Sequence, residues 1–205
     1  MSTLPMEFKT TPLFGGAMTA NLPSNFSDVS KIRQIPDHQE VYLDNDGLTS
    51  IIFEINERVD ASVVGSTSDE DAVRYHLDDV IEAEDDGKRE EGIRIVSLKA
   101  ETGEKLPPNT PTYTITATQK NPPTNTAGVI PDFIVVILTV IRLASKQTDL
   151  LITLNVPHAS GMYDRFAVDL SKDKLDGSLP MPQAERIREE ILKSFEILEW
   201  GLFDG

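Results

Sequence analysis

The chain has 205 residues, a length that fits one domain with a sizeable core, and the sequence contains no cysteine. The lack of cysteine excludes disulfides, thiolate nucleophiles and thiolate metal sites, and it is typical of proteins in a reducing compartment. The 34 acidic and 19 basic residues give a formal net charge of −15, which argues against nucleic acid and anionic membranes as direct partners.

The N-terminal part of the chain predicts short strands and turns. Residues 1–16 lack the basic start and apolar run of a secretory signal, so we expect no cleaved leader. Residues 17–22 can form a short strand, and Ser27 or Asp28 is expected to cap a brief helical turn.

Two further strands, at residues 40–43 and 50–55, flank the turn at 44–47. That turn resembles the start of a calcium loop, but it lacks the alternating oxygen ligands and the glutamate at the twelfth position. We therefore expect a hairpin.

A helix is predicted over residues 69–83, with Ser68 as its N-cap and acidic residues in its first turn. His76 lies beside the apolar stripe of this helix, so we expect a hydrogen-bonded core histidine and not a metal ligand. Twelve acidic residues fall between residues 60 and 91. They predict a solvated helix face followed by an acidic loop at 84–91, and steering of a basic partner is the open alternative.

The second half of the chain is rich in β-branched residues, and we expect strands at 93–98, 112–118, 132–143 and 149–156. A final helix has apolar residues at helical spacing. These residues are Ala184, Ile187, Ile191, Leu192, Phe195 and Leu198. Antiparallel strands with helices on the faces predict an α+β sandwich.

The sequence contains no nucleophile elbow, phosphate loop, zinc-protease motif or dinucleotide fingerprint. The three histidines, at positions 38, 76 and 158, lack local metal-ligand spacing. We expect no enzyme activity, cofactor or metal. A small hydrolase or metal site assembled by the fold stays open as an alternative.

The segment at residues 32–42 has a polar pattern that points to binding. Pro36 fixes its own φ and favours an extended residue before it, so the following residues should form a defined turn that presents Asp37 and Glu40. The alternative is structural: Asp37 caps the turn and Glu40 is an exposed edge charge.

The same residues, I-R-Q-I-P-D-H-Q-E-V-Y, together with L-F-G-G-A at 13–17 and F-S-D-V-S at 26–30, resemble the Ran guanine nucleotide release factors, the MOG family of nuclear import factors. The likeness extends through R-Y-H-L-D-D-V at 74–80 and T-D-L-L-I-T-L-N-V-P at 148–157. It covers roughly residues 11–205, which we take as a single domain after a flexible N-terminus at 1–10.

The resemblance implies a PsbP-like fold, namely a curved, roughly six-stranded antiparallel sheet with helices on both faces. It also implies a nuclear protein, with some in the cytoplasm, that binds the small GTPase Ran, promotes guanine nucleotide release and supports nuclear import. We expect a monomer, and a second Ran-binding protein in the complex stays open. The competing function is an adaptor that binds Ran without changing nucleotide exchange.

The implied Ran-binding residues are Asp37 and Glu40, with Gln39, Asp28 and Arg33 as further candidates. Because phosphate-loop GTPases hold the nucleotide through a lysine and Mg²⁺, an inserted carboxylate could compete for the lysine or exclude the metal. Glu40 is the first candidate for that carboxylate, with Asp37 shaping the turn that delivers it. Simple docking by both residues is the alternative.

Overall fold

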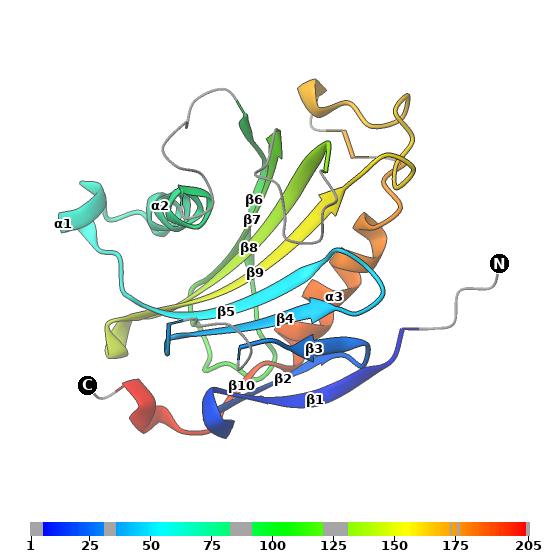
Figure 1. Cartoon of the computed structure of the whole chain (residues 1–205). Coiled ribbons are helices and arrows are strands. Elements are labelled where there is room, and N and C mark those ends of the chain that lie inside the picture. The colour runs from blue at the N-terminus through cyan, green and yellow to red at the C-terminus, as the bar shows by residue number, and fades with distance from the viewer. Residues whose placement is uncertain are drawn as a thin grey trace.

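The computed structural model describes residues 6–30, 36–82, 92–120, 131–172, 174–175 and 177–203. It is an α+β structure with one seven-stranded antiparallel sheet and one three-stranded sheet (Figure 1). The large sheet runs β3 (Phe26–Asp28), β4 (Gln39–Asp44), β5 (Ser50–Glu57), β9 (Thr148–His158), β8 (Phe133–Leu143), β7 (Thr112–Lys120) and β6 (Ile93–Glu101). The small sheet joins β1 (Phe8–Leu13), β2 (Met18–Pro23) and β10 (Glu196–Ile197).

Helices lie on both faces of the large sheet, as predicted (Figure 1). The helix α2 (Asp69–Glu82) contacts β7 on one face, and α3 (Met181–Ser194) contacts β9 and β2 on the other. A short helix, α1 (Ala61–Val64), follows β5. None of the helices in the described part of the chain is long and apolar enough to cross a membrane.

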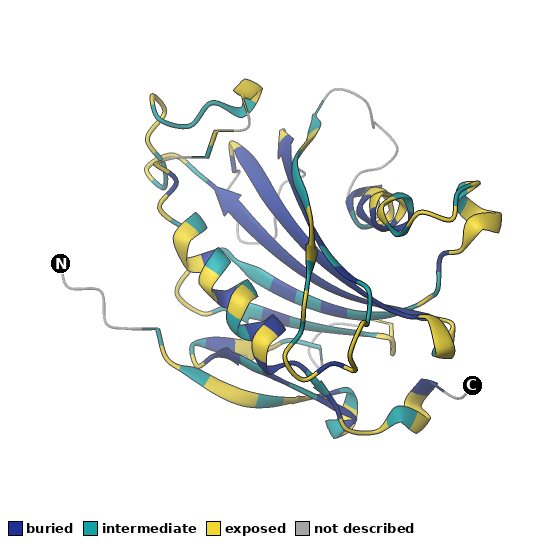
Figure 2. Ribbon diagram, turned by 180° about the vertical axis from the view of Figure 1, so that it is seen from behind, coloured by how far each residue is buried: buried dark blue, intermediate teal, exposed yellow. Residues whose placement is uncertain are grey.

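Strands β8 and β9 are buried along their whole length, which explains their long runs of β-branched and aliphatic residues (Figure 2). Alternate residues of a strand point to opposite faces. In β8, Val135 and Ile137 therefore join the core beneath α3, whereas Val136 and Leu138 join the core beneath α2. These two consecutive strands pair with each other as an antiparallel hairpin.

The expected amphipathic character of α3 is confirmed, because Ala184, Ile187 and Ile191 are buried against the sheets while the opposite side of the helix is exposed (Figure 2). The prediction for Leu198 is wrong, since this side chain is 52% exposed. The helix ends at Ser194 because the chain turns into β10, which pairs with β2.

Two further predictions for the N-terminal region differ from the structure. Ser27 and Asp28 lie in β3, which pairs with β4, so strand pairing replaces the expected helix cap. Phe8 begins the paired strand β1, although residues 1–10 were predicted to be a flexible terminus. The Phe8 ring packs against the core and lies beneath the Arg186 guanidinium, 5.5 Å from it, which helps to hold this end of the strand.

A buried polar network connects α2 to the β8–β9 hairpin. Asp149, which is 0% exposed, accepts hydrogen bonds from His76 Nε2 at 2.9 Å, Val59 N–H at 3.0 Å and Arg142 Nε at 3.1 Å. Arg142 also donates to Asp69 and to the Val59 carbonyl. The prediction of a hydrogen-bonded core histidine at position 76 is thereby confirmed. Burial alone would raise the pKa of Asp149, but the bonds from His76 and Val59 and the charge of Arg142 lower it below its ordinary value.

Candidate partner-binding surface

The turn at residues 36–39 leads into β4 and presents Asp37 to solvent. Gln39 N–H donates to the Pro36 carbonyl at 3.0 Å, which closes the turn. The N–H of Ile55 donates to the His38 carbonyl at 3.0 Å, which ties the turn to β5. The side chains of Asp37 and His38 are exposed. The turn therefore holds one carboxylate in an accessible position on a fixed backbone.

The two residues after this turn point to opposite faces of the large sheet, because they are consecutive in a strand. Gln39 lies opposite Glu54 in the register, on the face that carries α2. Glu40 lies opposite Phe53, whose side chain belongs to the core beneath α3. The structure consequently does not bring Asp37, Gln39 and Glu40 together as one patch.

Glu40 connects β4 to the loop that joins β1 and β2. Its Oε1 accepts the backbone N–H of Phe14 at 2.8 Å, and its Oε2 accepts the Tyr42 hydroxyl at 3.1 Å. The Glu40 side chain is half-buried. Neither of the alternatives considered for Glu40, an inserted carboxylate or an exposed edge charge, included this contact with the L-F-G-G-A segment.

The loop at residues 14–16 explains why that segment has its composition. Phe14, Gly15 and Gly16 have φ values of 50°, 69° and 97°, all in the left-handed region. Glycine adopts this region without cost, whereas a phenylalanine there is strained by about 1–2 kcal/mol. The hydrogen bond from Phe14 N–H to Glu40 therefore stabilises a backbone conformation that is unfavourable for Phe14 and readily adopted by the two glycines.

Asp28 lies on the same face as Glu40, since it pairs with Tyr42 across β3 and β4. Asp28 is exposed, and its Oδ1 accepts the N–H of Ser30 at 2.9 Å. Burial raises the pKa of the Tyr42 hydroxyl above its ordinary value, and the charges of Glu40 and Asp28 raise it further. The Glu40 and Asp28 carboxylates therefore lie near the Tyr42 hydroxyl, and Glu40 also contacts the loop at 14–16.

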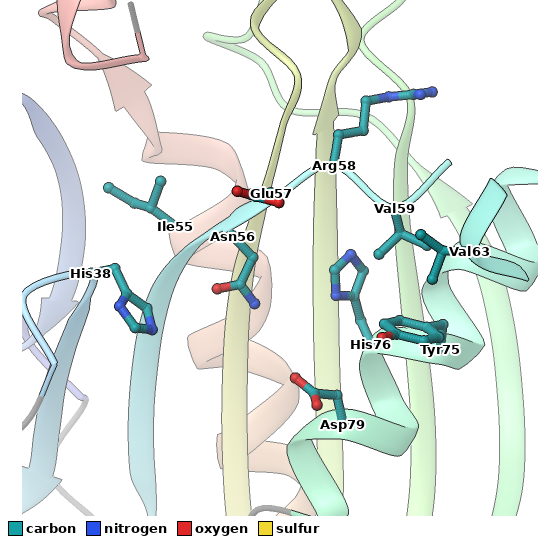
Figure 3. Close-up of a pocket in the computed structure, with 10 residues that line it drawn as sticks. All are labelled: His38, Ile55, Asn56, Glu57, Arg58, Val59, Val63, Tyr75, His76 and Asp79. Carbon is teal, nitrogen blue, oxygen red and sulfur yellow. The ribbon is translucent and has the colours of Figure 1, made fainter. Parts of the chain in front are cut away.

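On the other face, a cavity of about 470 Å³ opens beside the turn. Its walls come from the turn, the C-terminal end of β5, α1 and α2. Asn56, His76 and Asp79 point into this space, and His38 faces them from the opposite side, whereas the Arg58 side chain extends away (Figure 3). His76 belongs to the buried network described above, so its Nε2 is already bound to Asp149.

Glu54 lies next to this cavity and accepts a hydrogen bond from the Gln39 amide. Burial raises the pKa of Glu54 above its ordinary value, against the opposing effects of the Gln39 hydrogen bond and of His38, while the charge of Asp79 raises it further. The Gln39 side chain therefore lies near the cavity, on the opposite face of the sheet from the Glu40 side chain.

Among the predicted site residues, the structure places Asp37 at the turn and Gln39 beside the cavity. Glu40 contacts the loop at 14–16, and Asp28 lies opposite Tyr42 on the same face of the sheet as Glu40. Arg33 and the acidic segment 84–91 lie outside the described residues. No functional role was predicted for Phe14, Asn56, Tyr75 or Asp79. Consecutive glycines at positions 15 and 16 were the available signal for the loop, but the cavity is formed by distant segments and had no local signal.

The model of the Ran-interacting Mog1 protein family matches residues 11–157. The chain belongs to the Mog1 family. The probable Ran guanine nucleotide release factor of Dictyostelium discoideum is 30% identical over 199 residues, which cover 96% of each chain. The nuclear import protein MOG1 of Saccharomyces cerevisiae is 27% identical over 209 residues, covering 97% of this chain and 86% of that protein.

Solved structures agree with the family fold. The crystal structure of the S. cerevisiae Ran-binding protein Mog1p has a TM-score of 0.71 and 24% identity, and the match covers 97% of this chain and 99% of that one. The solution structure of the PsbP protein from the cyanobacterium Synechocystis has a TM-score of 0.53 at 12% identity, with coverage of 95% and 94%. The expected PsbP-like fold is thus confirmed, with seven strands in the large sheet instead of about six.

Proposed function

We propose that this protein binds the small GTPase Ran and promotes release of its guanine nucleotide, and that it supports nuclear protein import in this way. Its membership in the Mog1 family, with relatives named as Ran release factors and nuclear import proteins, supports this function. The observation in the structure that carries the proposal is the exposed Asp37 carboxylate on a turn closed by backbone hydrogen bonds.

In this proposal Asp37 contacts Ran directly and Glu40 acts as a positioning residue. Asp37 is exposed, and among the hydrogen bonds between described residues none uses its carboxylate. Both Glu40 oxygens accept hydrogen bonds within the protein, which supports a role in holding the loop at residues 14–16. Asp37 is then the better candidate for a carboxylate that competes for the nucleotide-binding lysine or excludes Mg²⁺.

The protein would act without covalent chemistry, as a single-domain monomer, in the nucleus with some in the cytoplasm. Thermodynamic linkage makes the proposal quantitative. If this protein lowers the affinity of Ran for nucleotide by some factor, then nucleotide lowers the affinity of Ran for this protein by the same factor. A coupling of about 1–3 kcal/mol corresponds to roughly 5- to 150-fold.

The test is stopped-flow release of a fluorescent guanine nucleotide from purified Ran, with and without a saturating amount of this protein. We expect faster release, and we expect added GTP to displace the protein from Ran. Binding that leaves the release rate unchanged and is indifferent to GTP would support the adaptor function instead. Absence of binding to Ran in any nucleotide state would overturn the proposal.

The role of Asp37 is tested with Asp37→Lys and a matched control, Asp46→Lys. Asp46 is also exposed, but it lies in the turn at the other end of β4. Loss of one member of a desolvated charge pair costs about 2–5 kcal/mol, so we expect at least about 30-fold weaker binding for Asp37→Lys. The control should bind within a few-fold of the unchanged protein. Equal binding by both variants would remove Asp37 from the interface.

A further inference from the structure

The cavity beside the Asp37 turn has features that the proposed function does not yet use. It measures about 470 Å³, within the range of about 300–1,000 Å³ that is usual for ligand pockets. Part of its wall is apolar and unusually accessible, because Val63 is 52% exposed and Tyr75 is 43% exposed. Large apolar side chains that gather at the rim of a pocket are typical of binding sites.

The polar groups of the cavity favour a cation. Asp79 and the amide of Asn56 point into the space, and the Arg58 guanidinium is directed away from it (Figure 3). Glu57 also lines the cavity and is the second acidic residue of its wall. His76 is buried and its Nε2 is bound to Asp149, so this nitrogen is not available to an occupant of the cavity.

We propose that this cavity receives a lysine or arginine side chain of the protein partner. The aliphatic part of that side chain would lie against Val63 and Tyr75, and its charged end would reach Asp79. An aromatic ring also attracts a nearby cation through its π face, which suits Tyr75. The inference rests on the proposed binding to Ran and extends the contact surface from the Asp37 turn, through His38, to α1 and α2.

The charge of the whole protein supports this choice of occupant. A net charge of −15 steers basic surfaces toward the molecule, and carboxylates at the mouth of a cavity concentrate that effect. An anionic occupant would meet Asp79, Glu57 and the negative potential of the whole protein together. A basic side chain is therefore the chemistry that complements the site.

The experiment measures the affinity of purified Ran for Asp79→Asn and for the control Asp78→Asn. Asp78 is the neighbouring residue of α2, is also exposed, and does not line the cavity, so its variant changes the net charge by the same amount. We expect about 10- to 100-fold weaker binding for Asp79→Asn, comparable to the loss of a charge-assisted contact, and less than 3-fold for Asp78→Asn. Circular dichroism and melting temperature check that each variant is folded.

A double-mutant cycle identifies the occupant. Exposed lysines and arginines of Ran are changed to alanine one at a time, and each is combined with Asp79→Asn. A single basic residue whose loss no longer matters once Asp79 is changed is the expected result. Equal affinities for the Asp79 and Asp78 variants, with Asp37→Lys still defective, would overturn this inference while leaving the proposed function intact. Failure of the unchanged protein to bind Ran would instead remove the proposed function.

Discussion

The two faces of β5 show how differently the two sides of the large sheet are built. Toward α3, the strand contributes Ile51 and Phe53, which are 0% and 2% exposed and lie in the main core. Toward α2, it contributes Ile52, Glu54 and Asn56, which are only half-buried and lead to the cavity. One face supplies most of the apolar packing, whereas the other carries polar groups that can meet a partner. We infer that stability and recognition are largely separated by the sheet.

The largest loss of stability is expected when apolar packing is removed from the α3 face. Phe195 is 2% exposed, so Phe195→Ala should lower the free energy of unfolding by about 3–5 kcal/mol, through lost burial and a residual cavity. Urea denaturation measures this loss. The molecules that remain folded should bind Ran with unchanged affinity. A loss below about 1 kcal/mol would mean that the packing of this residue contributes little.

The buried network tests whether the α2 face also has an element that is essential for stability. Asp149→Leu leaves Arg142 and His76 without their shared carboxylate, and removal of one partner from a buried ion pair costs about 3–5 kcal/mol. We expect about 3 kcal/mol in urea denaturation, because Arg142 retains Asp69 and the Val59 carbonyl.

The matched control for that substitution is the double variant Asp149→Leu with Arg142→Met. Replacement of a buried pair by apolar residues of similar size is often neutral, so the double variant should be more stable than Asp149→Leu alone. A double variant that is as unstable as the single one would indicate that packing, and not an unpaired charge, dominates the loss.

A smaller effect is expected at Glu40, which lies on the α3 face but near its edge. Glu40→Ala removes the acceptor of Phe14 N–H, and a hydrogen bond to a charged group is worth about 1.5–3 kcal/mol. We expect a stability loss at the low end of this range, and faster hydrogen exchange of the Phe14 amide in NMR spectra. Glu40→Gln keeps an acceptor and should restore most of the protection. Unchanged exchange of the Phe14 amide in Glu40→Ala would show that the loop keeps its conformation without this hydrogen bond.

The smallest predicted effect concerns pH. His158 is 0% exposed, stacks on Phe133 with ring centroids 4.3 Å apart, and bonds to Ser178 Oγ at 2.7 Å. Burial lowers its pKa below the ordinary value, so the unfolded chain takes up a proton that the folded protein excludes. The free energy of unfolding is therefore unaffected by protonation of His158 above a pH of about 6.5. It decreases as the pH falls below that value, by at most about 1.4 kcal/mol per pH unit.

Denaturation curves between pH 7.5 and 5.5 measure that slope, and His158→Gln supplies the comparison. The glutamine variant should be less stable at neutral pH but less sensitive to acid over this interval. An identical slope in both proteins would mean that other groups account for the acid sensitivity.

Much of the fold could be predicted because its signals are local. The β-branched runs of β7, β8 and β9 and the spacing of Val73, Leu77 and Ile81 in α2 each need only a short window of sequence. The exposed position of Leu198 could not be read in this way, because the pairing of β10 with β2 ends the helical pattern early. The same is true of Asp28, where pairing with β4 overrides a local preference for capping.

The candidate site was predicted less completely, for a related reason. The turn at Pro36 and the exposure of Asp37 follow from local backbone rules. The contact of Glu40 with Phe14 spans 26 positions in the chain, and the cavity requires the turn, β5 and α2 to be assembled. These contacts join residues that are far apart in the chain, so no short stretch of sequence could predict them. The opposite orientations of Gln39 and Glu40, by contrast, follow from strand alternation once β4 is placed at the residues after the turn.

The position of β2 has a consequence for synthesis of the protein. This early strand packs on α3 and pairs with β10, so Met18 and Leu22 are covered by segments that are made last. Translation from Pro23 to Ile197 takes on the order of 10 to 35 s at about 5–20 residues per second. During that interval the hairpin of β1 and β2 leaves the ribosome with an uncovered apolar side. We expect chaperones that bind such surfaces to bind this hairpin until α3 and β10 have been made.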